Sequence, residues 1–503
     1  MKTITMRHIL GNKVLEYDVD DRGVIVDERE IDRTVNHKPN IADWVKEHMV
    51  FWYDMSKPVD VYTQNFNDWQ NYNPNSVSIT NNKIVVNGLI DNFRIASIGK
   101  ETESFSVFIE GLGDKNLAYR VKLDENSDQI TNIKLKDGEN VLPHSFATTV
   151  AFMGVIGVTD YIGLTITQLP SGQSVPTNEI LKANPYLQDF SGNNRPLKLN
   201  NFLFAAMSGV DGYNQNFLSN KWLINQNKGT VKIESSSSFV IQAIKLEHAG
   251  IVYRYTDNEK VIIKCNITGI TEEIKGKFVF GYSDVTGINN IILENGYFEF
   301  ITSEHEGLDG WYGFKAIIPI DNCNITVTQI PEYPGALVTD GVDDYGQVQN
   351  FKSLQNYMMF YQCAVIKPTR TAKGMFSTIS DSNNNNGWVL LQNQGKNISR
   401  FGNGAYMNVQ LPDDSEAKTD YIVTGNGNKM TLYVGDKTQT LNGTYTSIGS
   451  TMGYFLSDYS SLARFGSLAF YKSILFDSVP TKETDGFTEQ ELIDYVLENL
   501  ITK

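Results

Sequence analysis

Closely spaced carboxylates are the residues of this sequence that come nearest to a catalytic arrangement. Retaining glycoside hydrolases hold two carboxyl groups about 5–5.5 Å apart, and acid-x-acid spacing on a strand puts both on one face. The candidates are Glu304 and Glu306 with Asp309 nearby, and the adjacent Asp124 and Glu125. Both groups fall in polar stretches typical of solvated loops, so we expect neither to be catalytic.

Other reactive groups are scattered along the chain. None of the six histidines lies in a glycine-rich elbow or near a cysteine motif, and no phosphate-binding or dinucleotide-binding glycine motif is present. Cys265, Cys323 and Cys363 form no CxxC pair, so we expect three buried free thiols. The sequence therefore predicts no enzyme, no catalytic residue, no bound metal and no cofactor.

Length and composition set the fold class. The 503 residues exceed one hydrophobic core, and 25 Tyr with 26 Phe favour strands. A net charge of -15 disfavours nucleic acid and anionic membrane surfaces as partners. No apolar run fits a signal peptide or a membrane span. We therefore expect synthesis in a cytoplasm, with action outside a cell only as part of a particle.

An internal repeat is the strongest pattern in the sequence. Three pairs of segments match at similar offsets: Leu164–Pro170 with Ile325–Pro331, Ser106–Gly111 with Lys264–Gly269, and Asp137-Gly138 with Asn295-Gly296. Apolar and polar residues alternate with a period of two in both regions. The repeat predicts two antiparallel, jelly-roll-like sandwiches at 41–177 and 209–333, with one large barrel as the alternative.

The two ends of the chain have their own patterns. Residues 1–40 have short strand patterns separated by turns, and so few strands need a partner. We predict a docking arm in which residues 1–35 bind another protein by strand addition; an edge pair on the first sandwich is the alternative. At the other end, Thr488 and Glu491 form a capping box ahead of an apolar stripe, which predicts a helix within 486–503.

Two segments carry a family resemblance. Asn184–Asn193 contains an Asp-x-Ser-Gly-Asn turn, and Pro334–Tyr345 contains Asp-Gly-Val-Asp-Asp-Tyr. Both resemble hallmarks of laminin-G-like, concanavalin A-like domains. About 140 residues separate them, so the second sandwich would be inserted into a discontinuous domain of 178–208 and 334–485. The predicted fold class is all-β: tandem antiparallel sandwiches, a concanavalin A-like lectin domain and a short C-terminal helix.

This arrangement also resembles structural proteins of bacteriophages that infect gut Bacteroidales, including crAss-like phages. The resemblance implies a homo-oligomer, a dimer or trimer, located in the virion. We expect a capsid-attached head fibre whose residues 1–35 bind capsid or other virion proteins, with host surface glycans as further partners. The alternative is a tail fibre, a receptor-binding protein or another carbohydrate-binding adhesin.

The lectin-like resemblance directs attention to particular residues. Trp388, next to an Asn-rich loop, and Tyr406 are the candidate glycan contacts. Calcium prefers oxygen ligands, so Asp340, Asp343 and Asp344 are possible ligands, together with Asp381 and Asn383 in a neighbouring loop. Turn capping by Asp343 and Asp344 is the interpretation that we favour, and no metal site is assigned.

Overall fold

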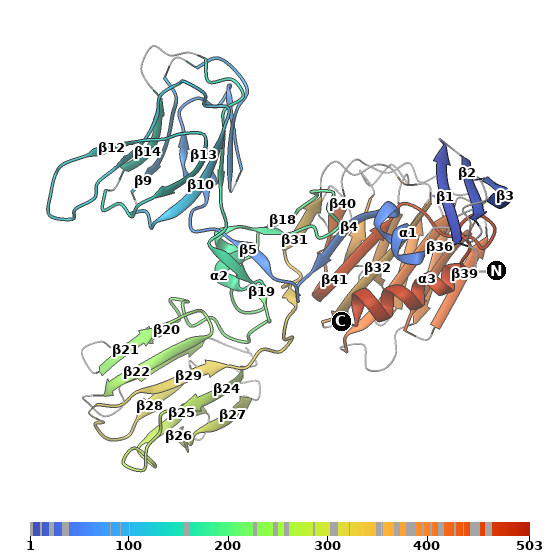
Figure 1. Cartoon of the computed structure of the whole chain (residues 1–503). Coiled ribbons are helices and arrows are strands. Elements are labelled where there is room, and N and C mark those ends of the chain that lie inside the picture. Colours follow the sequence, from blue (N-terminus) through green and yellow to red (C-terminus); the bar gives the residue numbers. More distant parts are fainter. Residues whose placement is uncertain are drawn as a thin grey trace.

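The computed structural model describes residues 4–10, 13–19, 25–32 and 40–502, apart from short gaps within the last range. These gaps are residues 81, 91, 100, 148, 155–159, 225–228, 245–249, 256–260, 285–286, 302–309, 321, 349–353, 355, 367–372, 379–387, 394–396, 403–404, 411–416, 427–428, 436, 443–452 and 458–464. The fold is all-β, as predicted, with three lobes that meet at a central junction (Figure 1). In the part of the chain described, no helix is long and apolar enough to cross a membrane.

The first lobe is a sandwich of two five-stranded antiparallel sheets. One sheet has the order β13 (Gly138–Leu142), β10 (Phe105–Glu110), β15 (Thr165–Gln168), β8 (Lys83–Val86) and β7 (Val77–Ile79). The other has the order β12 (Thr131–Lys134), β11 (Leu117–Val121), β14 (Thr149–Gly154), β9 (Arg94–Ile98) and β6 (Gln70–Asn71). A short helix, η1 (Phe66–Asp68), leads into this lobe.

The second lobe has the same plan. One sheet has the order β21 (Gly229–Ile233), β22 (Ser238–Ile244), β29 (Ile325–Gln329), β24 (Ile262–Thr268) and β27 (Gly296–Ile301). The other has the order β20 (Trp222–Ile224), β23 (Gly250–Tyr255), β28 (Gly310–Ala316), β25 (Phe278–Asp284) and β26 (Gly287–Ile292).

The topology of both lobes is that of a jelly roll. Counting strands from β8 in the first lobe and from β22 in the second, strands one, eight, three and six are neighbours in one sheet. Strands two, seven, four and five are neighbours in the other. The three repeated sequence pairs fall on equivalent elements, namely β15 with β29, β10 with β24, and the starts of β13 and β27.

The third lobe is the concanavalin A-like sandwich, and it has two large antiparallel sheets. One has the order β17 (Tyr186–Leu187), β18 (Leu197–Asn200), β31 (Tyr345–Val348), β40 (Gly453–Phe455), β33 (Lys373–Ser377), β34 (Trp388–Asn393), β35 (Asn397–Gly402) and β36 (Ala405–Gln410). The other has the order β19 (Gly209–Val210), β30 (Leu337–Val338), β41 (Leu468–Phe476), β32 (Asn356–Val365), β37 (Thr419–Asn426), β38 (Lys429–Val434) and β39 (Lys437–Asn442).

The structure places residues 41–54 in this third lobe and not in the first sandwich, where the sequence assigned them. Strand β4 (Met49–Asp54) pairs with β41, and Phe51 and Tyr53 are fully buried in the core between the large sheets. The partner strand lies more than 400 residues further along the chain, and a local pattern cannot reveal such a pairing. The insertion likewise begins after β19 and not at residue 209, because Gly209 and Val210 pair with β30.

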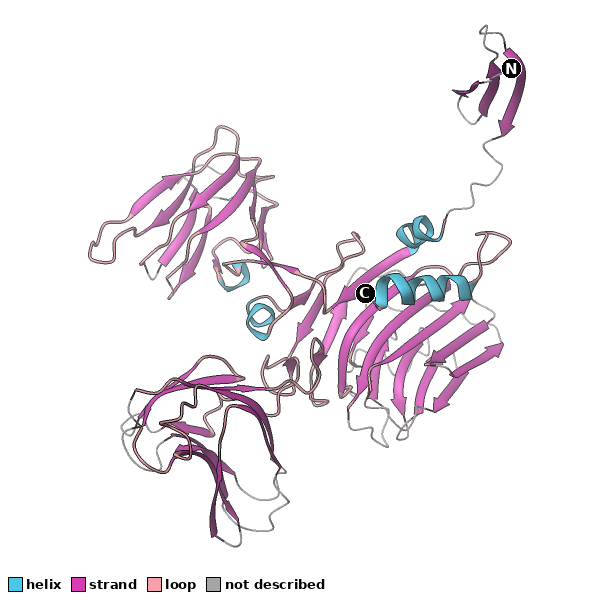
Figure 2. Cartoon of the chain, turned by 60° about the horizontal axis from the view of Figure 1, so that its bottom comes forward, coloured by secondary structure: helices cyan, strands magenta, loops and turns pink. Residues whose placement is uncertain are grey.

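Helices cover the outer face of the sheet that contains β41 (Figure 2). α1 (Ile41–His48) and α3 (Glu489–Val496) bury Trp44, Leu492 and Val496 against it. Thr488 and Glu491 form the predicted capping box, and the helix continues as one π turn, Leu497–Ile501.

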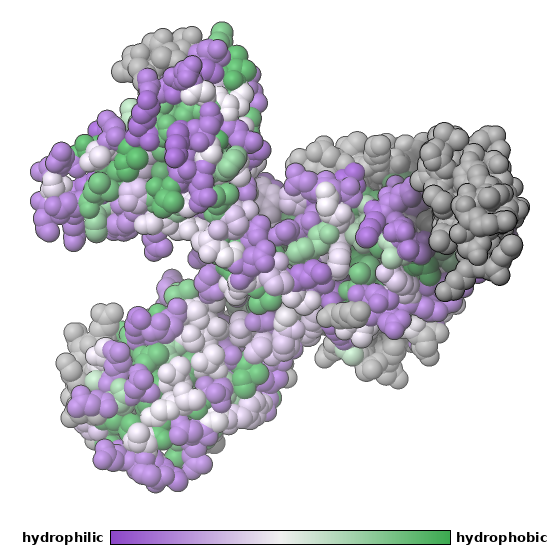
Figure 3. Space-filling view, viewed as in Figure 1, coloured by the Kyte–Doolittle hydropathy of each residue, from purple (hydrophilic) through white to green (hydrophobic). Residues whose placement is uncertain are grey.

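The N-terminal strands form a separate small sheet, of order β1 (Ile4–Leu10), β2 (Lys13–Val19) and β3 (Ile25–Asp32). Among the strands described, these three pair only with one another, so the alternative of an edge pair on the first sandwich is wrong. In Figure 2 this sheet stands clear of the three lobes. The visible surface of the lobes mixes hydrophilic and apolar residues (Figure 3).

Candidate functional site

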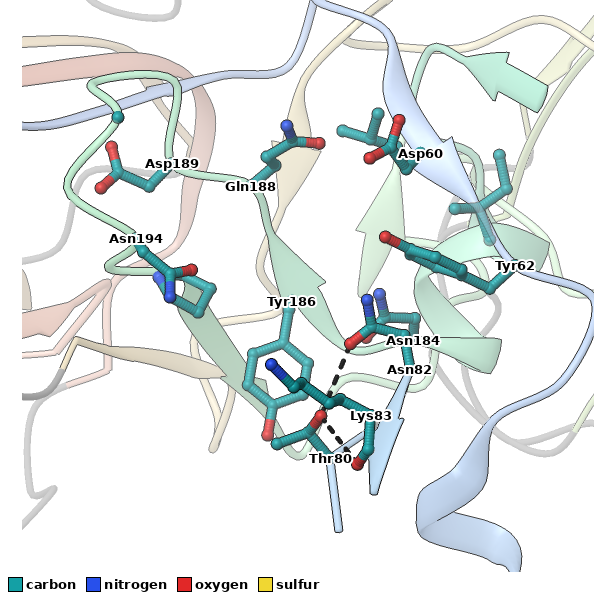
Figure 4. A pocket seen from close by; sticks show the side chains of 14 residues that line it. Asp60, Tyr62, Thr80, Asn82, Lys83, Asn184, Tyr186, Gln188, Asp189 and Asn194 are labelled. Carbon is teal, nitrogen blue, oxygen red and sulfur yellow. Dashed lines mark hydrogen bonds between the residues drawn. The ribbon is translucent and has the colours of Figure 1, made fainter. Parts of the chain in front are cut away.

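A cavity of about 670 Å³, with both polar and apolar lining, lies where the first lobe meets the third (Figure 4). Three segments that are distant in the sequence line it. They are β5 (Val59–Val61) with Tyr62, the turn between β7 and β8, and the stretch from Asn184 to Pro196 after α2 (Asn178–Ala183).

Strand β5 positions two of the lining side chains. It pairs with β16 (Gly172–Ser174), and Gln173 Nε2 donates a hydrogen bond to Asp60 Oδ1 at 3.0 Å. Burial, followed by the nearby Asp60 carboxylate, raises the pKa of Tyr62, so its phenol stays neutral at physiological pH. Asn65 Nδ2 donates to the carbonyl of Ala183 at 2.7 Å, which ties the end of this segment to α2.

The Asp-x-Ser-Gly-Asn turn forms the opposite wall. Asp189 Oδ1 accepts hydrogen bonds from the backbone N–H of Trp52 at 3.0 Å and of Ser191 at 2.9 Å. Asn193 Nδ2 donates to the carbonyl of Met49 at 2.7 Å. The turn therefore satisfies backbone groups of β4 that have no strand beside them, and this fixes the wall of the cavity.

The side chains around the cavity suit a ligand rich in hydroxyl groups. Figure 4 shows Asp60, Asn82 and Gln188 around the cavity, together with the rings of Tyr62 and Tyr186. Carboxylate and amide groups supply acceptors and donors, and Tyr rings supply flat apolar faces.

Asn184 also lines the cavity. Its Oδ1 is buried and has no hydrogen-bond partner among the residues that the structure describes. The same holds for eight other buried side-chain atoms among the described residues, and an atom that is closed to solvent is also closed to a ligand in the cavity.

The predicted glycan contacts lie elsewhere. Trp388 begins β34 and Tyr406 lies in β36, and their side chains are outside the described residues. The strand register pairs Trp388 with Gly402 and Tyr406 with Phe401. Since neighbouring residues of a strand alternate between faces, the two positions belong to opposite faces and do not form one site. Their roles stay predictions.

The structure brings together the three acids that are possible calcium ligands. Asp340, Asp343 and Asp344 each have a carboxylate oxygen within 4.8 Å of the others. Asp344 is fully buried and accepts hydrogen bonds from Ser208 Oγ at 3.0 Å and from Asp340 N at 3.1 Å. Burial raises its pKa to about 7. Donors from the protein already bind both oxygens of this carboxylate, which therefore connects the loop of Ser208 to that of Asp340. Asp381 and Asn383 are outside the described residues.

The structure describes some, but not all, of the acidic residues that the sequence offers as catalytic candidates. Asp124 accepts a hydrogen bond from Asn126 N at 2.9 Å within an exposed turn, while Glu304, Glu306 and Asp309 are outside the described residues. Cys265, Cys323 and Cys363 are buried free thiols, as predicted.

Sequence reasoning missed the cavity, although one signal was available. The run Tyr62-Thr-Gln-Asn-Phe66 recurs as Tyr213-Asn-Gln-Asn-Phe217, at the entry to the second jelly roll. Recognising this fourth repeated pair would have marked residues 62–66 as a junction element.

Comparison with known proteins gives distant structural likenesses only. No known family and no curated protein matches the sequence. Carbohydrate-binding module CBM66 from Bacillus subtilis is 14% identical, over 28% of this chain and 89% of that chain, with a TM-score of 0.18. Domains LG4-5 of the mouse laminin alpha1 chain are 9% identical, over 54% and 91%, with a TM-score of 0.23. Trypanosoma rangeli sialidase in complex with sialic acid is 9% identical, over 97% and 89%, with a TM-score of 0.26.

The sialidase matches correct the expectation that this chain is not an enzyme. They span nearly the whole chain and they are to an enzyme, so the matched structures are not binding modules alone. TM-scores this far below 0.5 assign no activity to this chain.

Proposed function

We propose that this chain is a carbohydrate-binding protein and that it binds glycans in the cavity between the first and third lobes. The convergence of Asp60, Asn82 and Gln188 from three separate segments on one cavity is the observation that carries the proposal, because carboxylate and amide groups pair well with sugar hydroxyls.

The rest of the cavity supports the same ligand class. Gln188 and Asn82 provide amide groups that both donate and accept, and Asp60 provides a strong acceptor. The rings of Tyr62 and Tyr186 offer apolar faces for the C–H side of a sugar ring. A few convergent polar groups around aromatic surface are typical of small-molecule sites.

A glycan array probed with the labelled full chain, followed by calorimetric titration of the hits, tests this proposal. We expect Gln188→Ala and Tyr62→Ala to weaken binding at least tenfold. Tyr297→Ala is the matched control, because Tyr297 is an exposed tyrosine on the second jelly roll and should leave binding unchanged. Absence of any glycan hit, or binding that survives both cavity variants, would contradict the proposal.

We further propose that the chain is a homo-oligomeric bacteriophage fibre subunit that is anchored to the virion through residues 1–35. The N-terminal sheet supports this proposal, because its three strands pair only among themselves, of the strands described, and a single three-stranded sheet needs a partner against which to pack one face. Binding to another protein would stabilise them.

Deletion of residues 1–35 tests the anchoring. We expect the truncated chain to keep its glycan binding and its thermal unfolding temperature but to lose association with phage particles in sedimentation. Truncated protein that still assembles on particles would refute anchoring through this arm.

A further inference from the structure

The two jelly rolls can be superimposed residue by residue at the edge nearest the junction, because their hydrogen bonds match. Leu169 N donates to the carbonyl of Ser106 at 2.8 Å, and Ile330 N donates to the carbonyl of Lys264 at 2.9 Å. Ser106 therefore corresponds to Lys264.

A second matched pair extends the correspondence. Gln64 N donates to Gln168 Oε1 at 3.2 Å, and Gln215 N donates to Gln329 Oε1 at 2.9 Å. Counting from these glutamines along the chain, Thr63 corresponds to Asn214, and Ser171 to Glu332.

In the second jelly roll, charged side chains fill the space between these positions. Lys264 Nζ lies 2.8 Å from Glu332 Oε1, with both side chains about three-quarters buried. Asn214 Nδ2 donates to the same Glu332 Oε1 at 2.6 Å.

In the first jelly roll, the same place is a hollow of about 220 Å³. Its lining has no charged side chain, and it combines hydroxyl groups with apolar surface. The main contributors are Thr63, Ser104, Ser106, Ser171, Val141 and Leu169. Val141 lies opposite Ser106 on the neighbouring strand and is 71% exposed.

This hollow is linked to the glycan cavity through lining residues of a third hollow. Thr63 also lines an intermediate hollow of about 240 Å³, which shares Asp60, Tyr62 and Asn184 with the main cavity. Residues 59–65 therefore contribute to the lining of all three hollows.

We propose that the hydroxyl-lined hollow is an extension of the glycan site and that the ligand is a chain of several sugar units, with a neutral unit in this hollow. The inference rests on the proposed glycan binding. Serine and threonine hydroxyls both donate and accept, as sugar hydroxyls require, and Val141 and Leu169 can cover a C–H face. The absence of a charged group in the lining selects against an acidic unit.

The test uses malto-, cello- and chito-oligosaccharides of one to six units, titrated calorimetrically into the full chain. We expect the affinity to rise at least tenfold between the shortest ligand that binds and one two or three units longer. The Ser106→Lys/Ser171→Glu double variant rebuilds the ion pair of the second jelly roll in the hollow. It should bind the short ligand with the affinity of the unaltered chain, but its affinity should not rise as the oligosaccharide becomes longer.

Two further variants keep the result interpretable. Val141→Glu places a charge at an exposed rim position that tolerates it, and it should reduce the same gain even if the double variant fails to fold. Lys264→Ser/Glu332→Ser opens the equivalent space in the second jelly roll and should leave all affinities unchanged.

The outcomes separate the two proposals. If none of these oligosaccharides binds the unaltered chain and the glycan array is also blank, the proposed function fails. If short ligands bind but length adds nothing, or if the variants with a filled hollow keep the full gain, only the extended site is refuted.

Discussion

The first and second jelly rolls share several matched turn and backbone hydrogen bonds but differ in the side chains at one edge. Asp137 accepts hydrogen bonds from the N–H of Leu112 at 2.9 Å and of Gly113 at 2.7 Å. At the equivalent position, Asn295 accepts from the N–H of Ile270 at 2.9 Å. Where the second jelly roll has the Lys264–Glu332 ion pair, however, the first has serines. The comparison shows that matched turn hydrogen bonds accompany the shared topology, while the side chains at the same edge differ, with an ion pair in one lobe and hydroxyl groups in the other.

The largest effect that sharpens this comparison should come from the paired turn glycines. Gly111 and Gly269 have φ of 77° and 88°, and an added Cβ would lie 2.5 Å from the carbonyl oxygen of Gly163 or 2.0 Å from that of Asn324. Gly111→Ala and Gly269→Ala should each destabilise their own lobe by about 2–4 kcal/mol, from backbone strain and the clash. Differential scanning calorimetry would measure it, with Gly172→Ala as the unstrained control. A large loss of stability for only one of the two variants would show that the two turns are not structurally equivalent.

The buried glutamines should respond unequally. Gln329 Nε2 donates to the carbonyls of Gln215 at 2.8 Å and Ser236 at 3.3 Å, whereas Gln168 Nε2 is buried without a partner among the residues described. Gln329→Leu should therefore cost about 1–3 kcal/mol, and Gln168→Leu clearly less, because Gln168 makes fewer hydrogen bonds. Urea unfolding of both variants would show the difference. Equal losses of stability would mean that the two glutamine side chains make equally strong hydrogen bonds.

The smallest effect should come from the ion pair. Lys264→Ser should destabilise the second jelly roll by about 1 kcal/mol or less, because the pair remains partly exposed.

The hydrogen bond to Glu332 raises the pKa of Lys264 above its usual 10.5. A raised lysine pKa stabilises the fold fully below pH 10.5, and this stabilisation is lost as the pH rises through the folded-state pKa. Thermal unfolding should thus separate the variant from the unaltered chain near pH 8 and bring them together at strongly alkaline pH. A difference that persists there would point to packing.

Local patterns were enough for the repeated framework of this molecule. The sequence could predict features that depend on residues only a few positions apart. These are the alternation in β15 and β29, the turns at Asp137-Gly138 and Asn295-Gly296, and the cap at Thr488. The assignment of β4 failed because its pairing with β41 is set by a strand at the far end of the chain.

The sequence by itself determined that the chain is built of antiparallel sandwiches, two of which repeat, because strand period and turn chemistry are local. Only the tertiary structure decided where a ligand could bind. Asp60, Asn82 and Asn184 come from three separate segments, and no spacing in the sequence links them. They meet because the docking of the first lobe on the third leaves a polar space that their side chains line.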